Sequence, residues 1–343
     1  MQDIADAVGT SKMTVSRILR GDVRSASKSL RERILTKAEE LGYLRNPLIS
    51  AAMAERRSRG SSLQTVKIAY VMGDPAQKLP IVPDVQKGAE QRAEELGFLL
   101  ETILTSKAGG SGRRLRQILD SRGVDGCLFS LAVERQMISD FDMSGLCCAT
   151  HHLKLRGLGI PLVTIDYTQH MHVALAEAMT RGFKKPGMIF SGPVSTDMGR
   201  NLLAALALHA FEQSVPFIPA FESYTTPDAL KLREWLSRWE PEIVILVGKN
   251  SLADFAVLSQ EEKSRRGWIQ VAAPHVEQFL AATIHEGLRI GAALVDRIAS
   301  ALYRNDRGTR HAADMVFSEV RFKPGPSLPS QPRKKTRKKL KAN

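Results

Sequence analysis

The sequence lacks any long apolar stretch, because no run free of Asp, Glu, Lys and Arg exceeds 11 residues. A membrane-spanning helix needs about 20 such residues. The first residues, MQDIADAVG, contain two acids and no apolar segment, so we expect no secretory signal here. Three cysteines, two of them adjacent, cannot form a disulfide framework and favour a reducing cytoplasm. A membrane protein and a secreted module are therefore excluded.

What is present is an ordinary globular composition with an uneven distribution of charge. The chain has 343 residues, 43% of them hydrophobic and 25% charged, which is enough for about two to three domains. The net charge is +13, of which residues 1–60 carry +5, residues 331–343 carry +7 and residues 61–330 only +1. A near-neutral body with basic ends favours a polyanionic partner, although basic tails also serve solubility.

The first 42 residues show the periodicity of three short helices. Residues 2–8 form the first, and Gly9-Thr10 ends it. Ser11 is a good N-cap for a second helix that runs to about Arg20. Ser29 and Glu32 have capping-box spacing for a third, which stops at Gly42. The apolar positions predicted to face inward are Ile4, Ala5, Val8, Val15, Ile18, Leu19, Leu30, Ile34, Ala38 and Leu41.

Two short helices joined by a tight turn and followed by a longer helix are typical of a helix-turn-helix unit. The second helix would enter a major groove, with Lys12, Met13, Ser16 and Arg17 on its outward side. Lys12 and Arg17 can donate to guanine or phosphate, and Met13 can contact a thymine methyl group. Spacing alone also allows a generic three-helix bundle with a charged face.

Particular residues make the DNA-binding interpretation more specific. The first 47 residues contain a set of motifs in an order that resembles the lactose/galactose repressor family of bacterial transcription factors. These motifs are Asp3-Ile4-Ala5, Gly9, Ser11, Thr14-Val15-Ser16-Arg17, Glu40-Leu41-Gly42-Tyr43 and Asn46-Pro47. The resemblance implies that Lys12, Met13 and Arg17 read operator bases and that Ser11 and Ser16 contact phosphates. Thr14 and Arg20 are further candidates. The family has residues before its first helix, so we expect the true start to lie upstream of Met1.

A second helix start follows the head. Asn46-Pro47 is an N-cap followed by proline, and residues 48–57 can continue as a helix. The resemblance implies a hinge helix that folds in the minor groove when two subunits meet, with a wedge residue that kinks the duplex. Ala52 occupies the wedge position and is too small to unstack bases, so Met53 would do part of this work or the bend would be shallower. An ordinary linker helix is the alternative.

The body alternates between apolar β-rich runs and helical patterns, which predicts an α/β fold with parallel sheets in two doubly wound halves. The expected strands are 66–72, 98–104, 127–131, 162–165, 187–191, 217–222 and 243–247, and the expected helices are 85–97, 113–122, 172–182, 200–213, 228–238 and 277–302. Motifs such as Lys87-Gly88-Ala89-Glu90 and Val124-Asp125-Gly126 resemble the family's effector domain, which is similar to a periplasmic sugar-binding protein.

The resulting domain organisation has four parts. We expect a helix-turn-helix head at 1–45, a hinge helix and linker at 46–62, an effector and dimerisation domain at 63–325 and a basic disordered tail at 326–343. The resemblance implies three chain crossings between the halves of the effector domain. These halves are expected at 63–165 plus 275–300 and at 166–274 plus 301–325.

The resemblance also implies an effector-binding cleft between the halves. Asp166, Arg200 and Asn250 stand at the family's ligand-binding places. Two departures weaken the case for a sugar: Ser251 replaces an aspartate, and residues 272–275 read Ala-Ala-Pro-His where an acidic motif is expected. The cleft would then bind another small molecule or none.

No catalytic, metal or cofactor site is expected. Residues 147–152, CCATHH, offer soft ligands, but adjacent ligands on a strand point to opposite faces. The glycine-rich residues 109–112 lack the spacing of a phosphate-binding loop, and no nucleophile elbow or zinc-protease motif occurs.

The sequence thus predicts a cytoplasmic, nucleoid-associated homodimer of the repressor type. It would bind a near-palindromic operator and respond to an unidentified small molecule. The alternatives are an architectural DNA-binding protein without effector control, or a solute-binding protein or α/β enzyme with an incidental helical head.

Overall fold

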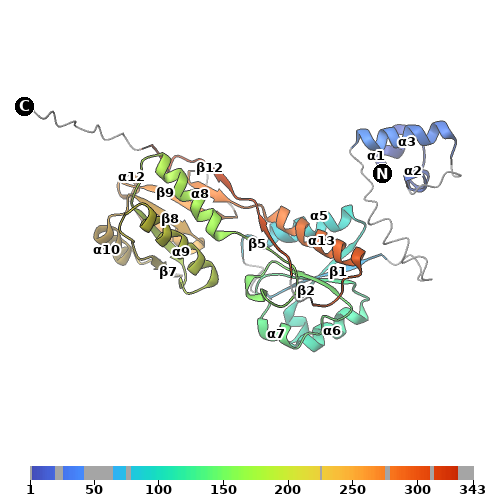
Figure 1. Ribbon diagram of the computed structural model, residues 1–343, viewed down its shortest axis with the longest axis horizontal. Helices are drawn as coiled ribbons and strands as arrows, with labels where there is room; N and C mark the ends of the chain where they lie inside the picture. Colours follow the sequence, from blue (N-terminus) through green and yellow to red (C-terminus); the bar gives the residue numbers. More distant parts are fainter. Residues whose placement is uncertain are drawn as a thin grey trace, which may run out of the picture.

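A computed structural model describes residues 2–19, 26–41, 65–74, 79–224, 226–274, 279–309 and 313–330. Three helices, α1 (Gln2–Val8), α2 (Lys12–Leu19) and α3 (Lys28–Glu40), form the head (Figure 1). Their shared core consists of Ile4, Ala5, Val8, Val15, Ile18, Ile34 and Ala38. The Arg33 guanidinium donates to the Val8 carbonyl at 3.2 Å and so satisfies the end of α1. The three predicted helices are confirmed.

Two details of the third helix differ from the prediction. Its cap is Ser27 rather than Ser29, because the Leu30 amide donates to Ser27 Oγ at 3.3 Å and the helix begins at Lys28. Leu41, predicted to face inward, is 50% exposed. It lies one residue beyond the helix, so the helical spacing no longer directs its side chain to the core.

The first lobe of the body is built on a parallel six-stranded sheet, ordered β11-β5-β4-β3-β1-β2. Helices α5 and α13 cover one face, and α6 and α7 cover the other. The strands are β1 (Lys67–Met72), β2 (Leu99–Leu104), β3 (Gly126–Phe129), β4 (Cys147–Thr150), β5 (Leu162–Ile165) and β11 (Met315–Ser318). The helices are α5 (Val82–Glu95), α6 (Gly112–Ser121), α7 (Arg135–Ser139) and α13 (Gly287–Arg304), with short 3₁₀ turns at Thr105–Ala108 and Leu153–Leu155.

The second lobe repeats this plan with the order β12-β10-β9-β8-β6-β7, and only β12 runs antiparallel to its neighbour. Helices α8 and α9 pack on one face, and α10 and α11 pack on the other. The strands are β6 (Pro186–Ser191), β7 (Phe221–Ser223), β8 (Ile243–Val247), β9 (Gly267–Ala273), β10 (Ala281–Ile284) and β12 (Arg321–Lys323). The helices are α8 (Tyr167–Thr180), α9 (Asp197–Glu212), α10 (Ala229–Trp239), α11 (Lys249–Ala256) and α12 (Gln260–Ser264).

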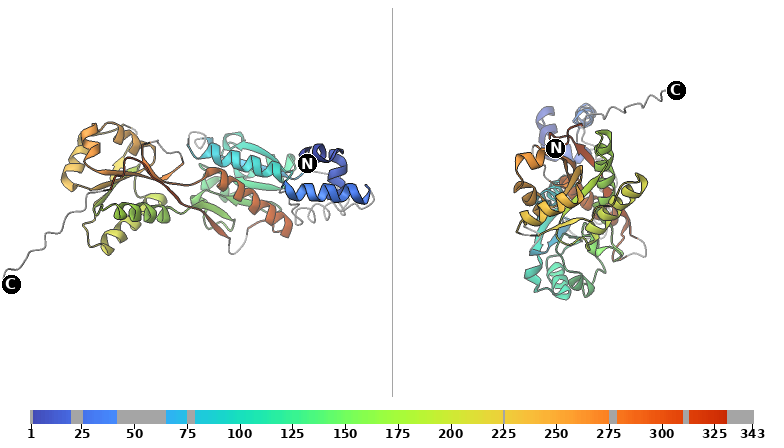
Figure 2. Two further views of the ribbon diagram at one scale, coloured as in Figure 1. Left: turned by 90° about the horizontal axis from the view of Figure 1, so that it is seen from above. Right: turned by 90° about the vertical axis from the view of Figure 1, so that its left-hand side faces the viewer.

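The chain passes between the lobes three times, and the two lobes lie side by side (Figure 2). The crossings follow β5 at Asp166, follow β10 at residues 285–286 and follow β11 at residues 319–320. Buried strands with βα connections favour parallel sheets covered on both faces. The predicted fold class, an α/β body of two doubly wound halves behind a helix-turn-helix head, is confirmed.

The expected division of the body was wrong near its end, and so was the expectation that the disordered tail begins at residue 326. Leu328 is 4% exposed in the core of the second lobe, and Ser327 Oγ donates to the Trp268 carbonyl at 2.7 Å. Strand β10, expected in the first half, belongs to the second sheet, and β11, expected in the second half, belongs to the first sheet. The helix predicted over 277–302 is in fact β10 followed by α13. Ala281 and Thr283 are fully buried, and a short apolar run of this kind has the same appearance in a buried strand and a buried helix.

Other predicted elements were shifted or missed. The strand predicted at 217–222 is β7 at Phe221–Ser223, since Pro216 and Pro219 lack the amide hydrogens that a strand needs. Helices α8 and α9 begin earlier than predicted because Asp166 and Thr196 cap them. The sequence patterns missed α7, α11, α12, β4, β9, β11 and β12, most of which are short.

Helices α5 and α13 touch backbone to backbone. A Cβ atom on Gly291 would lie 2.0 Å from the Val85 carbonyl oxygen, and one on Gly88 would lie 2.0 Å from the Leu288 carbonyl oxygen. Only glycine permits this separation, so these positions fix how α13 docks on the first lobe. No helix within the described ranges is long and apolar enough to cross a membrane.

Candidate functional site

Helix α2 presents an exposed polar face above a buried apolar one. Ser11 caps the helix: its Oγ accepts the Thr14 amide at 3.1 Å and lies 2.8 Å from Thr14 Oγ1. Val15 and Ile18 are buried in the head core. Lys12 and Arg17 are exposed, and Met13 is 62% exposed. The predicted N-cap and the predicted division of the two faces are confirmed at these residues.

The two cations on this face are available to an external partner. Within the described ranges, neither Lys12 nor Arg17 forms an ion pair, whereas Lys37 on α3 lies 2.8 Å from Glu40. The exposed Met13 side chain beside these two cations suits a ligand with both anionic and apolar groups.

Several predicted DNA-contacting residues are not placed. Arg20, Asn46, Ala52 and Met53 lie outside the described residues, and the side chain of Ser16 is also undescribed. Their predicted roles stay predictions.

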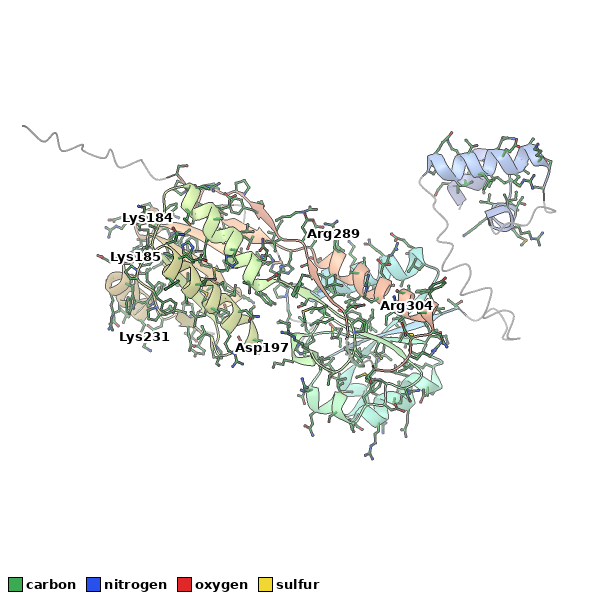
Figure 3. All side chains as sticks on the ribbon, in the orientation of Figure 1. Lys184, Lys185, Asp197, Lys231, Arg289 and Arg304 are labelled. Atoms are coloured by element: carbon green, nitrogen blue, oxygen red, sulfur yellow. The ribbon has the colours of Figure 1, made fainter. Side chains whose placement is uncertain are left out.

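The three predicted effector-binding residues lie at carboxyl ends of strands. Asp166 follows β5 at the first crossing, and its carboxylate accepts the Gln169 amide at 2.9 Å. Arg200 and Asn250 lie in the first turns of α9 and α11, which follow the neighbouring strands β6 and β8. The Arg200 side chain is 69% exposed, and its contact with the Asp197 carboxylate is long, at 3.4 Å. Asp197 lies toward the first lobe (Figure 3). Arg200 therefore has donors available for a ligand.

The structure explains how the family pattern is lost on this edge. Ser251, where an aspartate was expected, is fully buried, and its hydroxyl donates to the Gly248 carbonyl at 2.7 Å. The Ser251 amide donates to Ser191 Oγ at 3.0 Å, so Ser191 anchors the start of α11 to the end of β6. Ala273 is 1% exposed. Neither position offers a carboxylate to a sugar hydroxyl.

Sequence reasoning missed a buried polar chain at the end of the first sheet. Tyr70 Oη lies 2.9 Å from Ser130 Oγ, which lies 3.0 Å from His151 Nε2. Burial raises the pKa of Tyr70 to about 12 and lowers the pKa of His151 to about 3. The three residues come from different strands or strand ends, so no local spacing could have revealed them.

A second buried histidine lies beside a crossing. His170 of α8 is fully buried, and its Nδ1 lies 2.9 Å from Thr283 Oγ1 of β10. Its ring makes an edge-to-face contact with His285, with centroids 5.7 Å apart. Burial lowers the pKa of His170 to about 4. The predicted helix began only at residue 172, so the sequence did not indicate that His170 lies in α8 and is buried.

The remaining sequence clusters have structural roles. Cys147 and Cys148 of β4 point into the apolar clusters on opposite faces of the first sheet, as successive residues of a strand do. In the glycine-rich stretch, Ser111 caps α6 by accepting the Arg114 amide at 3.3 Å.

We expect the body to lose stability when the pH falls from 6.5 toward 4. His151 and His170 are neutral in the folded protein, whereas an unfolded histidine takes up a proton below pH about 6.5. The unfolded state then binds more protons, so each histidine costs about 1.4 kcal/mol of stability per pH unit until its folded pKa is reached. Urea unfolding at pH 7, 6 and 5 measures this loss.

His170→Asn should flatten that pH dependence, because an amide can still pair with Thr283 but does not titrate. His172→Gln, at an exposed position of the same helix, is the control and should leave the slope unchanged. An equal slope in all three proteins would contradict the prediction.

The geometry defines a class of protein: a helix-turn-helix head joined to a two-lobed α/β body. Comparison with known proteins then identifies its relatives. Residues 1–46 match the family model described as bacterial regulatory proteins, lacI family. The predicted resemblance to the lactose/galactose repressor family is thereby confirmed.

Curated relatives agree with this match. The chain is 30% identical over 132 residues to the HTH-type transcriptional regulator DegA of Bacillus subtilis, covering 38% of this chain and 36% of DegA. It is 24% identical over 198 residues to the regulator GalR of Streptococcus thermophilus, covering 57% and 55%. The alignments thus span about a third to a half of these relatives' lengths. Both are named as regulators and not as enzymes.

Solved structures share the fold of the chain. The transcriptional regulator CelR in complex with cellobiose superimposes with a TM-score of 0.59 at 19% identity, covering 94% of this chain and 98% of CelR. The lac repressor dimer bound to operator and the anti-inducer ONPF gives 0.59 at 14% identity, covering 95% and 98%. At these identities the likeness concerns the fold.

Proposed function

We propose that this chain is a sequence-specific DNA-binding transcriptional regulator of the repressor type. The observation that carries the proposal is the face of α2, where Lys12, Met13 and Arg17 are exposed and the two cations are unpaired within the described ranges. Arginine and lysine in a major groove donate to guanine, and an apolar tip contacts thymine methyl groups. Ser11, Thr14, Ser16 and Arg20 would contact the flanking phosphates.

The proposed regulator acts in the cytoplasm as a homodimer. One helix of eight residues reads only a few base pairs, so two-fold pairing is needed to define a long operator site. A near-palindromic operator follows from that symmetry. The segment that includes Asn46, Ala52 and Met53 would enter the central minor groove, with Met53 as the bulkier wedge.

The body would respond to a small molecule bound near Asp166, Arg200 and Asn250. Arg200 offers a planar guanidinium to hydroxyl or carboxylate groups. Because Ser251 and Ala273 remove the carboxylates that commonly hold sugar hydroxyls, an organic acid fits this edge better than a neutral sugar. The alternative, DNA binding without effector control, would leave the melting temperature of the body unchanged by sugars, nucleosides and organic acids alike.

The proposal is tested by selecting duplexes from a random pool with the full chain. We expect an enriched near-palindromic sequence that binds at least about a thousandfold more tightly than random DNA at the same salt concentration. Fluorescence anisotropy at two or more salt concentrations measures both affinities. If selected and random duplexes bind equally well, the proposal fails and the head has at most an architectural role.

A further inference from the structure

Four charged residues meet where two crossings of the chain pass between the lobes. Arg321 lies 2.7 Å from Glu286 and 3.4 Å from Glu319, and Arg289 lies 2.9 Å from Glu319 and 3.6 Å from Glu286. We call Glu286, Arg289, Glu319 and Arg321 the hinge ion cluster. It rims a cavity of about 270 Å³ whose floor includes Val163, Ile290 and Val316.

Three members of the cluster lie in the first lobe or at the first-lobe ends of the two crossings. Glu286 precedes α13, and Arg289 lies in its first turn, at the end of α13 nearer the second lobe (Figure 3). The close contact of Gly291 with the Val85 carbonyl holds that helix on α5. Glu319 directly follows β11, whose last residue, Ser318, pairs with Ile165 of the first sheet.

Arg321 instead belongs to the second lobe. It opens β12, and its backbone is in register with Ile284 of β10 in the second sheet. Its guanidinium therefore reaches from the second-lobe end of the third crossing to carboxylates at the first-lobe ends of the second and third crossings. By contrast, the pairs Arg92–Asp296 and Arg233–Glu262 each lie inside a single lobe.

We propose that Arg321 is a latch that sets the relative orientation of the two lobes. A rotation about the crossings moves the β12 backbone relative to α13 and so pulls Arg321 away from Glu286 and Glu319. Arg289 bridges the same two carboxylates from their own lobe and holds them in position for Arg321. The members are 39–63% exposed, so the latch is weak and is screened by salt. A weak latch suits a hinge, because a strong one would prevent movement.

The test measures the distance between the lobes in the full chain by pulsed electron spin resonance. Spin labels are attached at Lys107→Cys in the first lobe and Lys231→Cys in the second, both at exposed positions. The native cysteines, Cys127, Cys147 and Cys148, are buried and remain unlabelled in the folded protein. We expect Arg321→Gln to change the ratio of lobe orientations several-fold, and 1 M NaCl to do the same to the parent protein.

Arg233→Gln is the matched control, because it breaks an ion pair inside the second lobe and should leave the distance distribution unchanged. Arg321→Lys keeps the charge and should stay near the parent distribution. Glu286→Gln repeats the test from the other side should Arg321→Gln fold poorly. An unchanged distribution in both Arg321→Gln and Glu286→Gln, or an equal change in Arg233→Gln, would overturn the proposal. The measurement contains no DNA, so its outcome is independent of the proposed regulatory function.

Discussion

Replacing Lys12 and Arg17 together by alanine is expected to lower the affinity for a selected operator by at least about a hundredfold. Each contact to a base edge or phosphate is worth about 1–3 kcal/mol, and a dimer loses every contact twice. Both side chains are exposed and lie on the face of α2 opposite the buried Val15 and Ile18, so their removal should leave the head folded. Fluorescence anisotropy with selected and random duplexes measures the effect.

The matched control is Lys28→Ala with Lys37→Ala, which removes the same charge from α3 of the same head. That variant should bind selected and random duplexes more weakly by the same factor, since a general loss of positive charge reduces attraction to every phosphate backbone. If the two double variants behave identically, the face of α2 has no special part in recognition. The same conclusion would follow if the α2 variant kept the parent's ratio of affinities for selected and random DNA.

Gly291→Ala is expected to destabilise the first lobe by roughly 3 kcal/mol, at the upper end of typical overpacking costs. The added methyl group would lie 2.0 Å from the Val85 carbonyl oxygen and 2.5 Å from the Ala89 amide nitrogen. Backbone atoms cannot move aside by changing rotamer, so α5 and α13 must separate along their contact. The corresponding fall in melting temperature is roughly 6–12 °C, measured by circular dichroism or calorimetry.

Ala292→Ser is the control for that experiment, because it also adds one heavy atom to α13 but at a half-exposed position. It should shift the melting temperature by less than about 2 °C, as surface substitutions commonly do. An unchanged melting temperature in Gly291→Ala would mean that the two helices are not in close backbone contact.

The three helices of the head and the buried side of α2 were predicted from sequence because their signals are local. The cap at Ser11, the buried stripe of Val15 and Ile18 and the turn at Gly9 each depend on residues within one or two helical turns. Where the prediction failed, at Ser27 and Leu41, the error concerned helix ends. Helix ends are determined by a few competing caps and so carry the weakest periodic signal.

The candidate effector site was less accessible to sequence reasoning. Asp166, Arg200 and Asn250 were named from the resemblance to the repressor family, and the structure places them after β5, β6 and β8. The sequence did not predict that the Ser251 hydroxyl donates to the Gly248 carbonyl. It also did not predict the polar chain that runs from Tyr70 through Ser130 to His151. The Tyr70–Ser130 and Ser130–His151 contacts join residues at neighbouring strands, so the register of the sheet decides them. The Ser251–Gly248 contact is local and forms at the turn that begins α11.

The amino-acid order alone determined the three-helix head, the exposed cations of α2 and the alternation of buried strands with helices, since each arises from neighbours along the chain. Only the tertiary structure decided that β10 and β11 exchange sheets relative to expectation, that α13 rests on α5 at glycine, and that Arg321 reaches across to Glu286. Those outcomes depend on contacts between residues tens to hundreds of positions apart, which hydrophobic periodicity does not record.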